Sequence, residues 1–287
     1  MNAIIIAFIL VFSMALNIKI LARLSNGIDI SILNAIEIIA GFLLTIFIVL
    51  ALGQFKIFKS ITAEDCFYFV LSGFFSYGLA GFFSITHIRL SGDEKNALLS
   101  PLVTILVVVA GYFALSERVN SMQLIGISIV SVSVLFYQLK ANAVRITLSK
   151  PKEIIILATL CFVIVFGIIL TRIQINYTKL GFFEILFLRY SGALPVAFLM
   201  KRNVRYNIDN SSWIMIFTSV FISVVIVSTA WVYCNRELSN ITFQGIFATL
   251  PFAIVSLNYV IEKRYPSSKF LICSFISLLG ILILFMS

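Results

Sequence analysis

The chain has 287 residues, of which 61% are hydrophobic and 11% are charged, and its formal net charge is +9. A water-soluble domain carries roughly 25% charged residues, so this composition excludes a soluble globular protein. The basic residues occupy short gaps between apolar runs and form no continuous basic face, which argues against a nucleic-acid partner. We therefore expect an all-α integral membrane protein, because a segment that spans a bilayer satisfies its backbone hydrogen bonds as a helix.

Ten stretches of the chain are long and apolar enough to cross a bilayer, which takes about 20 residues of helix. The polar gaps between them are short, so the chain has no room for a soluble catalytic domain and an enzyme is not expected. In chain order the ten predicted transmembrane helices are Ala3–Leu21, Ile30–Leu52, Cys66–Thr86, Asp93–Leu115, Met122–Gln138, Ile154–Ile173, Gly181–Met200, Trp213–Cys234, Ile241–Ile261 and Phe270–Met286.

One pattern occurs twice, at the end of each half of the chain. An apolar segment carrying Pro101 is followed by a turn with Glu117 and a last apolar segment, and Pro251 and Glu262 repeat this arrangement. We expect each glutamate to bond free amides where the next helix begins. Such a duplicated hairpin is typical of transporters built from repeats.

The ten segments divide into five plus five, with a first repeat at residues 1–141 and a second at 142–287. Because five is an odd number, the second repeat must cross the membrane in the opposite sense to the first. The fold class we predict is therefore two inverted five-helix repeats, related by a pseudo-two-fold axis in the membrane plane. Exchange of conformations between such repeats turns a cavity that opens on one side into one that opens on the other.

Two ionisable residues lie at membrane depth and at equivalent positions of the two halves, Glu37 and Arg189. A charged group there costs about 2.5 to 3.5 kcal/mol on insertion scales and usually faces a cavity or a partner. One hypothesis is that Glu37 binds a substrate cation or a coupling proton while Arg189 binds an anionic group. The alternative is that the two residues pair with each other, or with backbone, and lock the halves together.

Other side chains are weaker candidates for substrate binding. Tyr77 and Trp231 could form an aromatic wall for an organic cation, or belong to an interfacial aromatic belt. His87, the single histidine, could relay protons or simply hydrogen-bond at the interface. Asp93 could project into the mouth of a cavity and attract cations. Glu184, near the start of its segment, is expected to be interfacial and solvated.

The two repeated prolines are candidate hinges. Pro101 and Pro251 each remove one helical hydrogen bond, and a kink at such a place can serve as a hinge or as a fixed packing feature. The freed carbonyl groups can also bind polar groups beside a cavity.

No metal or cofactor is expected. The four cysteines are isolated, the chain has a single histidine, and no CxxC pair occurs, so a metal site is not indicated. No phosphate-binding loop of the GxxxxGK[ST] type is present, which argues against direct use of ATP by this chain.

Three stretches carry a resemblance to a known family. Residues 96–126 read AsnAlaLeuLeuSerPro and, further on, SerGluArgValAsnSerMetGlnLeuIleGly; residues 247–269 include PheAlaThrLeuProPhe; residues 187–195 read PheLeuArgTyrSerGlyAlaLeuPro. With them the chain resembles the EamA-type branch of the drug/metabolite transporter superfamily. The resemblance implies a central cavity between the halves, peripheral fifth and tenth helices, and substrates such as small metabolites, amino acids, nucleotide derivatives or drugs.

The sequence thus predicts a secondary transporter of the cytoplasmic (inner) membrane. It would move a small organic metabolite, an amino-acid-like compound or a drug by alternating access, coupled to an ion or by exchange. The expected partners are that small molecule, membrane lipid and, in the coupled case, a proton or another ion, with the chain a monomer or a homodimer. Two rivals are a membrane scaffold or receptor that does not transport, and an integral-membrane enzyme, which would need clustered catalytic groups.

Overall fold

The computed structural model describes residues 2–53, 61–93, 96, 99–140, 151–200, 210–263, 265 and 268–286. Within these residues every regular element is a helix. The predicted boundary between the repeats, at residues 141 and 142, lies outside them. The first half contains α1 (Asn2–Ser25), α2 (Ile30–Ala51), α3 (Ala63–Gly73), η2 (Phe74–Leu79), α4 (Ala80–Ser91), α6 (Leu99–Ala114) and α7 (Ser121–Lys140). The second half contains α8 (Pro151–Ile175), α9 (Phe182–Leu199), α10 (Asn210–Phe221), η3 (Ile222–Ser228), α11 (Thr229–Glu237), α12 (Asn240–Phe247), α13 (Leu250–Glu262) and α14 (Ser268–Phe285).

These elements form ten apolar segments in the described part of the chain, which confirms the predicted fold class. Eight segments are long and apolar enough to cross a membrane, and two shorter apolar helices, Leu99–Ala114 and Ser121–Tyr137, complete the set. Three of the eight are composite: α3, η2 and α4 make one, α10, η3 and α11 another, and α12 with most of α13 a third. The chain is a multi-pass membrane protein.

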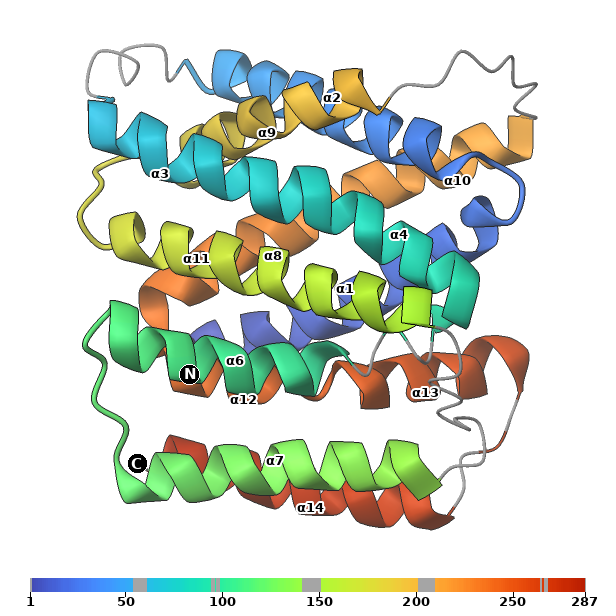
Figure 1. Ribbon diagram of the computed structural model, residues 1–287, viewed down its shortest axis with the longest axis vertical. Helices are drawn as coiled ribbons and strands as arrows, with labels where there is room; N and C mark the ends of the chain where they lie inside the picture. Colours follow the sequence, from blue (N-terminus) through green and yellow to red (C-terminus); the bar gives the residue numbers. More distant parts are fainter. Residues whose placement is uncertain are drawn as a thin grey trace.

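Equivalent helices of the two halves run in opposite directions. In Figure 1, α1 runs from left to right, whereas its counterpart α8 runs from right to left. The same reversal relates α2 to α9 and α7 to α14 (Figure 1). This is the inverted arrangement that an odd number of segments per half requires.

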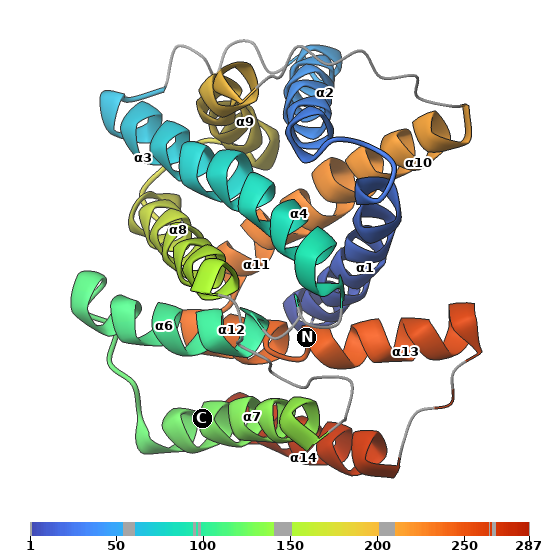
Figure 2. The same cartoon turned by 45° about the vertical axis from the view of Figure 1, so that its right-hand side comes forward.

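The helices α7 and α14 lie side by side at one edge of the molecule, where α7 contacts α6 and both contact α12 (Figure 1 and Figure 2). Their backbones approach closely at two glycines, because a Cβ atom on Gly126 would come within 2.9 Å of the Gly280 carbonyl oxygen, and the reverse distance is also 2.9 Å. The Ser133 hydroxyl group on α7 and the Ser277 hydroxyl group on α14 also hydrogen-bond to each other. Small residues and hydroxyl groups of this kind hold helices together in lipid, because the hydrophobic effect does not drive helices to associate there.

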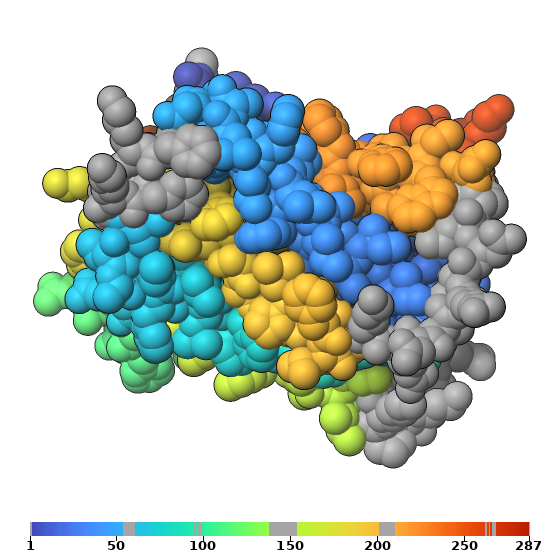
Figure 3. Space-filling model, turned by 90° about the horizontal axis from the view of Figure 1, so that it is seen from above, coloured from blue at the N-terminus to red at the C-terminus, as the bar shows by residue number. Residues whose placement is uncertain are grey.

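On the opposite side of the molecule α9 is packed between α2 and α3, and Figure 3 shows all three on one face. Exposed apolar side chains such as Leu43, Phe47 and Phe198 project from α2 and α9, as suits contact with lipid. Gly73 and Gly192 allow the tight crossing of α3 and α9: a Cβ atom would lie 1.7 Å from the Arg189 carbonyl oxygen at Gly73, and 1.9 Å from the Val70 carbonyl oxygen at Gly192.

Two π-helical segments interrupt the third apolar segment of each half. The segment η2 follows the 11 residues of α3, and η3 follows the 12 residues of α10, so they occupy matching places in the two halves. A π-helical turn is rare and often marks a functional site. Neither segment was predicted from the sequence.

Pro251 lies in the first turn of a helix, because it is the second residue of α13, directly after the chain leaves α12 at Ala248 and Thr249. Pro101 lies in α6, two residues after Leu99, where the description of this helix begins. A missing amide proton costs little in a first helical turn, where no intrahelical acceptor is available. A hinge at either proline stays a prediction.

Candidate functional site

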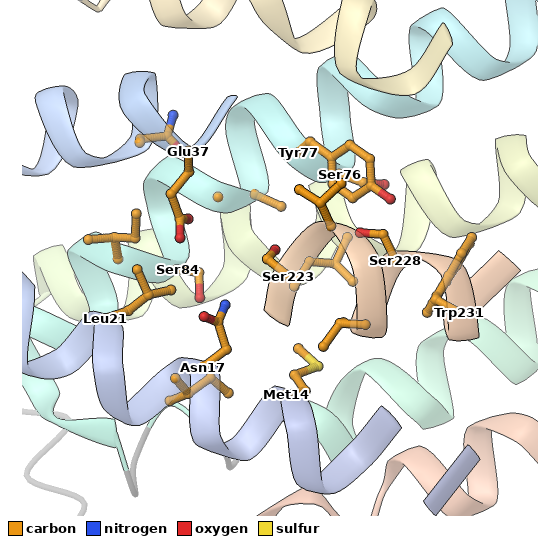
Figure 4. Close-up of a pocket in the computed structure, with 18 of the residues that line it drawn as sticks. Met14, Asn17, Leu21, Glu37, Ser76, Tyr77, Ser84, Ser223, Ser228 and Trp231 are labelled. Carbon is orange, nitrogen blue, oxygen red and sulfur yellow. The ribbon is translucent and has the colours of Figure 1, made fainter. Parts of the chain in front are cut away.

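A cavity of about 260 Å³ lies between the two halves of the molecule. Within the described residues, its lining comes from α1, α2, η2, α4 and α6 of the first half and from α8, α9, α10, η3, α11, α12 and α13 of the second. Figure 4 shows Glu37, Asn17 and Ser84 toward one end of this cavity and Tyr77, Ser228 and Trp231 toward the other. The peripheral pair α7 and α14 contributes no lining residue in the part of the chain that is described.

At the first end, three polar side chains from three helices meet. The Ser219 hydroxyl oxygen on α10 lies 2.6 Å from Glu37 Oε1 on α2 and 2.7 Å from Asn17 Oδ1 on α1. Asn17 and Ser219 are buried, and Glu37 is half-buried. Because α1 and α2 belong to the first half and α10 to the second, this cluster joins the two halves.

At the other end, the Arg189 guanidinium lies over two aromatic rings. Its central carbon lies 4.3 Å from the ring centroid of Tyr77 and 4.4 Å from that of Trp231. Arg189 is only 2% exposed, and its Nε and Nη1 atoms have no hydrogen-bond partner. The Tyr77 ring also stacks on Tyr190, at a centroid distance of 4.5 Å. The guanidinium is thus fixed by aromatic faces, while hydrogen-bonding capacity remains unused.

The structure brings Glu37, Arg189, Tyr77 and Trp231 to one cavity, but it does not pair the two charges. Glu37 bonds Ser219, and the guanidinium of Arg189 rests on aromatic rings. This arrangement differs from the alternative in which Glu37 and Arg189 lock the halves together. The ligand roles of all four residues stay predictions.

His87 and Asp93 are not among the residues that line the cavity. The His87 Nδ1 atom lies 3.1 Å from Asn96 Oδ1, and it is Asn96 that reaches the cavity wall. The Asp93 carboxylate pairs with the Lys19 ammonium group at 3.2 Å. A contact of either residue with substrate therefore stays a prediction.

Glu184 is buried, at 1% exposure, so the expectation of a solvated interfacial carboxylate is wrong. It lies in the first turn of α9, where the positive end of the helix dipole favours an acidic side chain. Arg236 interacts with it electrostatically and donates a hydrogen bond of 2.6 Å to the Leu180 carbonyl. Position near the end of an apolar segment fixes depth in the membrane, but lateral packing decides whether a side chain meets water.

A further polar cluster joins the halves where α6 and α8 end and α12 begins. The Asn240 side-chain amide donates to Glu117 Oε2 at 3.1 Å, and Arg172 Nη1 donates to the Leu238 carbonyl at 3.3 Å. Glu117 thus accepts from a side chain of the other half, not from amides of the next helix as expected. The side chain of Glu262 lies outside the described residues.

Several polar residues in and beside the cavity could not be singled out from the sequence. Neither Asn17, which lines the cavity, nor Ser219, which lies behind it, was a candidate. The two π-helical segments supply four more polar lining residues, Ser76 and Tyr77 from η2 and Ser223 and Ser228 from η3. Of these only Tyr77 was predicted, because a serine in an apolar run looks the same whether it packs helices or lines a cavity.

Comparison with known proteins agrees with this architecture. Residues 1–138 match the EamA-like transporter family. A solved structure described only as "Crystal structure of protein" superposes with a TM-score of 0.74 at 15% identity, and the match covers 98% of this chain and 96% of that chain. At that identity the likeness shows the fold alone. No curated protein matches the sequence.

The fold and the cavity between the inverted halves define a multi-pass membrane protein with the architecture of a transporter. Residues 1–138 belong to the EamA-like transporter family, which is part of the drug/metabolite transporter superfamily, as the sequence predicted. This membership indicates a membrane transporter, in a family that is typically not enzymatic.

Proposed function

We propose that the protein is a secondary transporter of the cytoplasmic membrane that carries a small, amino-acid-like compound with one anionic and one cationic group. The observation that supports this most is the presence of two opposite charges, Glu37 and Arg189, in one cavity without an ion pair between them. Charges that the protein itself does not neutralise remain available to bind a substrate that carries groups of opposite sign.

The anionic end of the substrate would lie at Arg189. Its guanidinium is held in place by Tyr77 and Trp231, and two of its nitrogens have no hydrogen-bond partner. A guanidinium with free donors suits a carboxylate or similar oxyanion, which it binds through two parallel hydrogen bonds. Binding of an anion would also satisfy donors whose burial without a partner is unfavourable.

The rest of the substrate would extend toward Glu37 along a mainly apolar wall that includes Met14, Val224 and Ile168. A volume of about 260 Å³ suits a small metabolite and is slightly below the range for ligand pockets, about 300 to 1,000 Å³. A positively charged amine at that end would be attracted by the carboxylate of Glu37.

Alternating access is supported by the inverted halves and by the different contacts at the two ends of the bundle. One end carries the Lys19–Asp93 ion pair, with side-chain exposures of 12% and 25%. The other end carries the bonds from Asn240 to Glu117 and from Arg172 to the Leu238 carbonyl. Opening either end would require the contacts at that end to separate while those at the other end hold.

A scaffold or receptor that does not transport is the second candidate. It would be expected to pair its buried charges and to fill the space between its halves. The cavity, and the absence of an ion pair between Glu37 and Arg189, favour the transporter.

The test is uptake by proteoliposomes of three probes that share one linear carbon chain: 6-aminohexanoate, its amide and hexanoate. The zwitterion should be taken up fastest, because the amide lacks the anion and the acid lacks the cation. Glu37→Gln and Arg189→Gln should each lower its uptake at least about tenfold. Glu64→Gln and Arg89→Gln, at exposed positions outside the cavity, serve as matched controls.

A charge reversal separates ligands from a structural pair. If Glu37 and Arg189 bind substrate, Glu37→Arg combined with Arg189→Glu should not restore uptake. Recovery in the double variant would favour a structural pair, and uptake of no probe above that of empty liposomes would count against this substrate class.

A further inference from the structure

The cluster of Glu37, Ser219 and Asn17 poses a problem of proton placement. Ser219 Oγ lies within hydrogen-bond distance of two oxygen atoms, Glu37 Oε1 at 2.6 Å and Asn17 Oδ1 at 2.7 Å. A hydroxyl group carries one proton and can donate it to only one of them. With Asn17 oriented so that Oδ1 faces Ser219, that oxygen has no proton to give, and the second contact then requires a proton on Glu37.

We propose that Glu37 is protonated in this conformation and is the site at which the carrier holds a coupling proton. The carboxylic acid of Glu37 then donates to Ser219 Oγ, and Ser219 donates to Asn17 Oδ1. Addition of the proton changes the carboxylate from a charge of −1 to a neutral acid, and no other bond forms or breaks. The inference deepens the proposed function, because it names the coupling ion of the same cavity.

The short oxygen–oxygen distances favour a proton over a metal cation. Two oxygens that bind one cation of the size of Na⁺ or Ca²⁺ at right angles lie about 3.4 Å apart, since each metal–oxygen bond is about 2.4 Å. Both contacts of Ser219 are shorter than that by more than half an ångström, and they match O–H···O hydrogen bonds. No group of acidic, histidine or cysteine side chains in the described residues is arranged to hold a metal.

The surroundings of Glu37 supply no compensating positive charge in the described residues. The helix α2 packs against α1, η2, α4, α9, α10 and η3, of which α10 and η3 carry no titratable side chain. Tyr190 interacts electrostatically with Glu37, Lys19 is bound to Asp93, and the guanidinium of Arg189 lies on aromatic rings. The titratable or charged residues on the other four elements are Lys19, Arg23, Tyr77, His87, Arg89, Glu184, Arg189 and Tyr190.

Protonation in this geometry connects the two halves of the carrier. The hydrogen-bond chain runs from α2 through α10 to α1, and so from the first half to the second and back. Loss of the proton would leave a carboxylate and an amide oxygen that compete for the single Ser219 proton, so one of the two contacts would open. The same carboxylate would then be free to attract the cationic group of a substrate, and proton and substrate would occupy it in turn.

The first test needs no substrate. The protein in lipid bilayers is titrated from acid to alkaline pH, and infrared spectroscopy follows the carbonyl stretch of a protonated carboxylic acid. We expect a titrating acid band in the wild type that is lost in Glu37→Gln. It should persist in Glu184→Gln, the matched control, because Glu184 is a buried glutamate that is not part of this cluster. Survival of the band in Glu37→Gln, absence of any acid band in the wild type, or a band moved by Na⁺ and not by pH would overturn the proposal.

The second test exploits the direction of the hydrogen bonds. In Asn17→Leu the Ser219 proton is freed to bond the carboxylate, so the midpoint of the Glu37 titration should fall by about one pH unit, a tenfold loss of proton affinity. If instead the Asn17 amide group donated to Ser219, and Ser219 to an ionised Glu37, removal of Asn17 would raise the midpoint and refute the proposed chain.

The proton site and the transport activity can fail separately. A titrating Glu37 band without uptake of any probe would reject the proposed transport and leave the proton site in place. Uptake of the zwitterion that is independent of a pH gradient in the wild type, together with no Glu37 band, would reject the proton site and leave the transporter.

Discussion

Substitution of Gly73 by alanine tests whether tight packing of α3 on α9 positions the charged end of the cavity. A Cβ atom at Gly73 would lie 1.7 Å from the Arg189 carbonyl oxygen, and contacts of a real Cβ atom are essentially never below 3.0 Å. The helices must therefore separate locally by at least 1.3 Å, the difference between these two values. The obstructing atom belongs to the backbone, so no side-chain rotation can relieve the contact.

The expected result has two parts. Overpacking of a well-packed site typically costs about 1 to 3 kcal/mol, which should appear as a lower melting temperature of the purified protein. A displacement of about 1 Å at a binding group can lower a rate about 100-fold, so uptake of the zwitterionic probe should fall by this order because Arg189 moves with its carbonyl.

A matched control is available in the same chain. A Cβ atom added at Gly27 would meet no other atom within 4 Å, so Gly27→Ala should leave both the melting temperature and uptake unchanged. Wild-type stability and uptake in Gly73→Ala would refute the idea that this crossing positions Arg189.

Three further predictions concern other parts of the molecule. Arg189→Lys should raise KM for the zwitterion at least about tenfold in uptake assays, because an ammonium group cannot lie flat on an aromatic ring or bind an oxyanion at two points; an unchanged KM would show that only the charge matters. Lys19→Asp should slow uptake. The double variant Lys19→Asp with Asp93→Lys should recover at least half of the lost uptake rate, because the 3.2 Å ion pair is rebuilt with reversed signs; no recovery would mean that the pair does not control opening. Gly280→Leu should lower the melting temperature, because the larger side chain pushes α14 away from α7. KM should stay at the wild-type value, because neither helix lines the cavity in the described part of the chain; a changed KM would place the peripheral pair in the binding mechanism.

The sequence was sufficient to predict the ten segments and the inverted halves, because bilayer thickness imposes a length and a polarity that few other structures share. It was also sufficient to select Glu37 and Arg189, since a charge at membrane depth is costly enough to require a reason. Hydroxyl and amide groups carry no comparable cost. Asn17 and Ser219 are therefore inconspicuous in an apolar segment, and only the packing of α1, α2 and α10 reveals that they meet.

Two other features depend on contacts between segments and could not be obtained from one segment at a time. The burial of Glu184 results from the approach of Arg236 and the turn before α9, which lie more than 50 residues apart in sequence. The π-helical turns require one extra residue to be accommodated within a helix, and an apolar run such as that of η3 carries no mark of where this happens.

The paired π-helical turns affect how relatives of this protein are compared. A relative that lacks one residue in η2 and continues as α-helix would present every later side chain of that segment turned by about 100°. Ser84, which lines the cavity here, would then have its counterpart one residue away in an ungapped alignment. Single-residue gaps within these two stretches should therefore be kept when alignments are used to infer which ligand a relative carries.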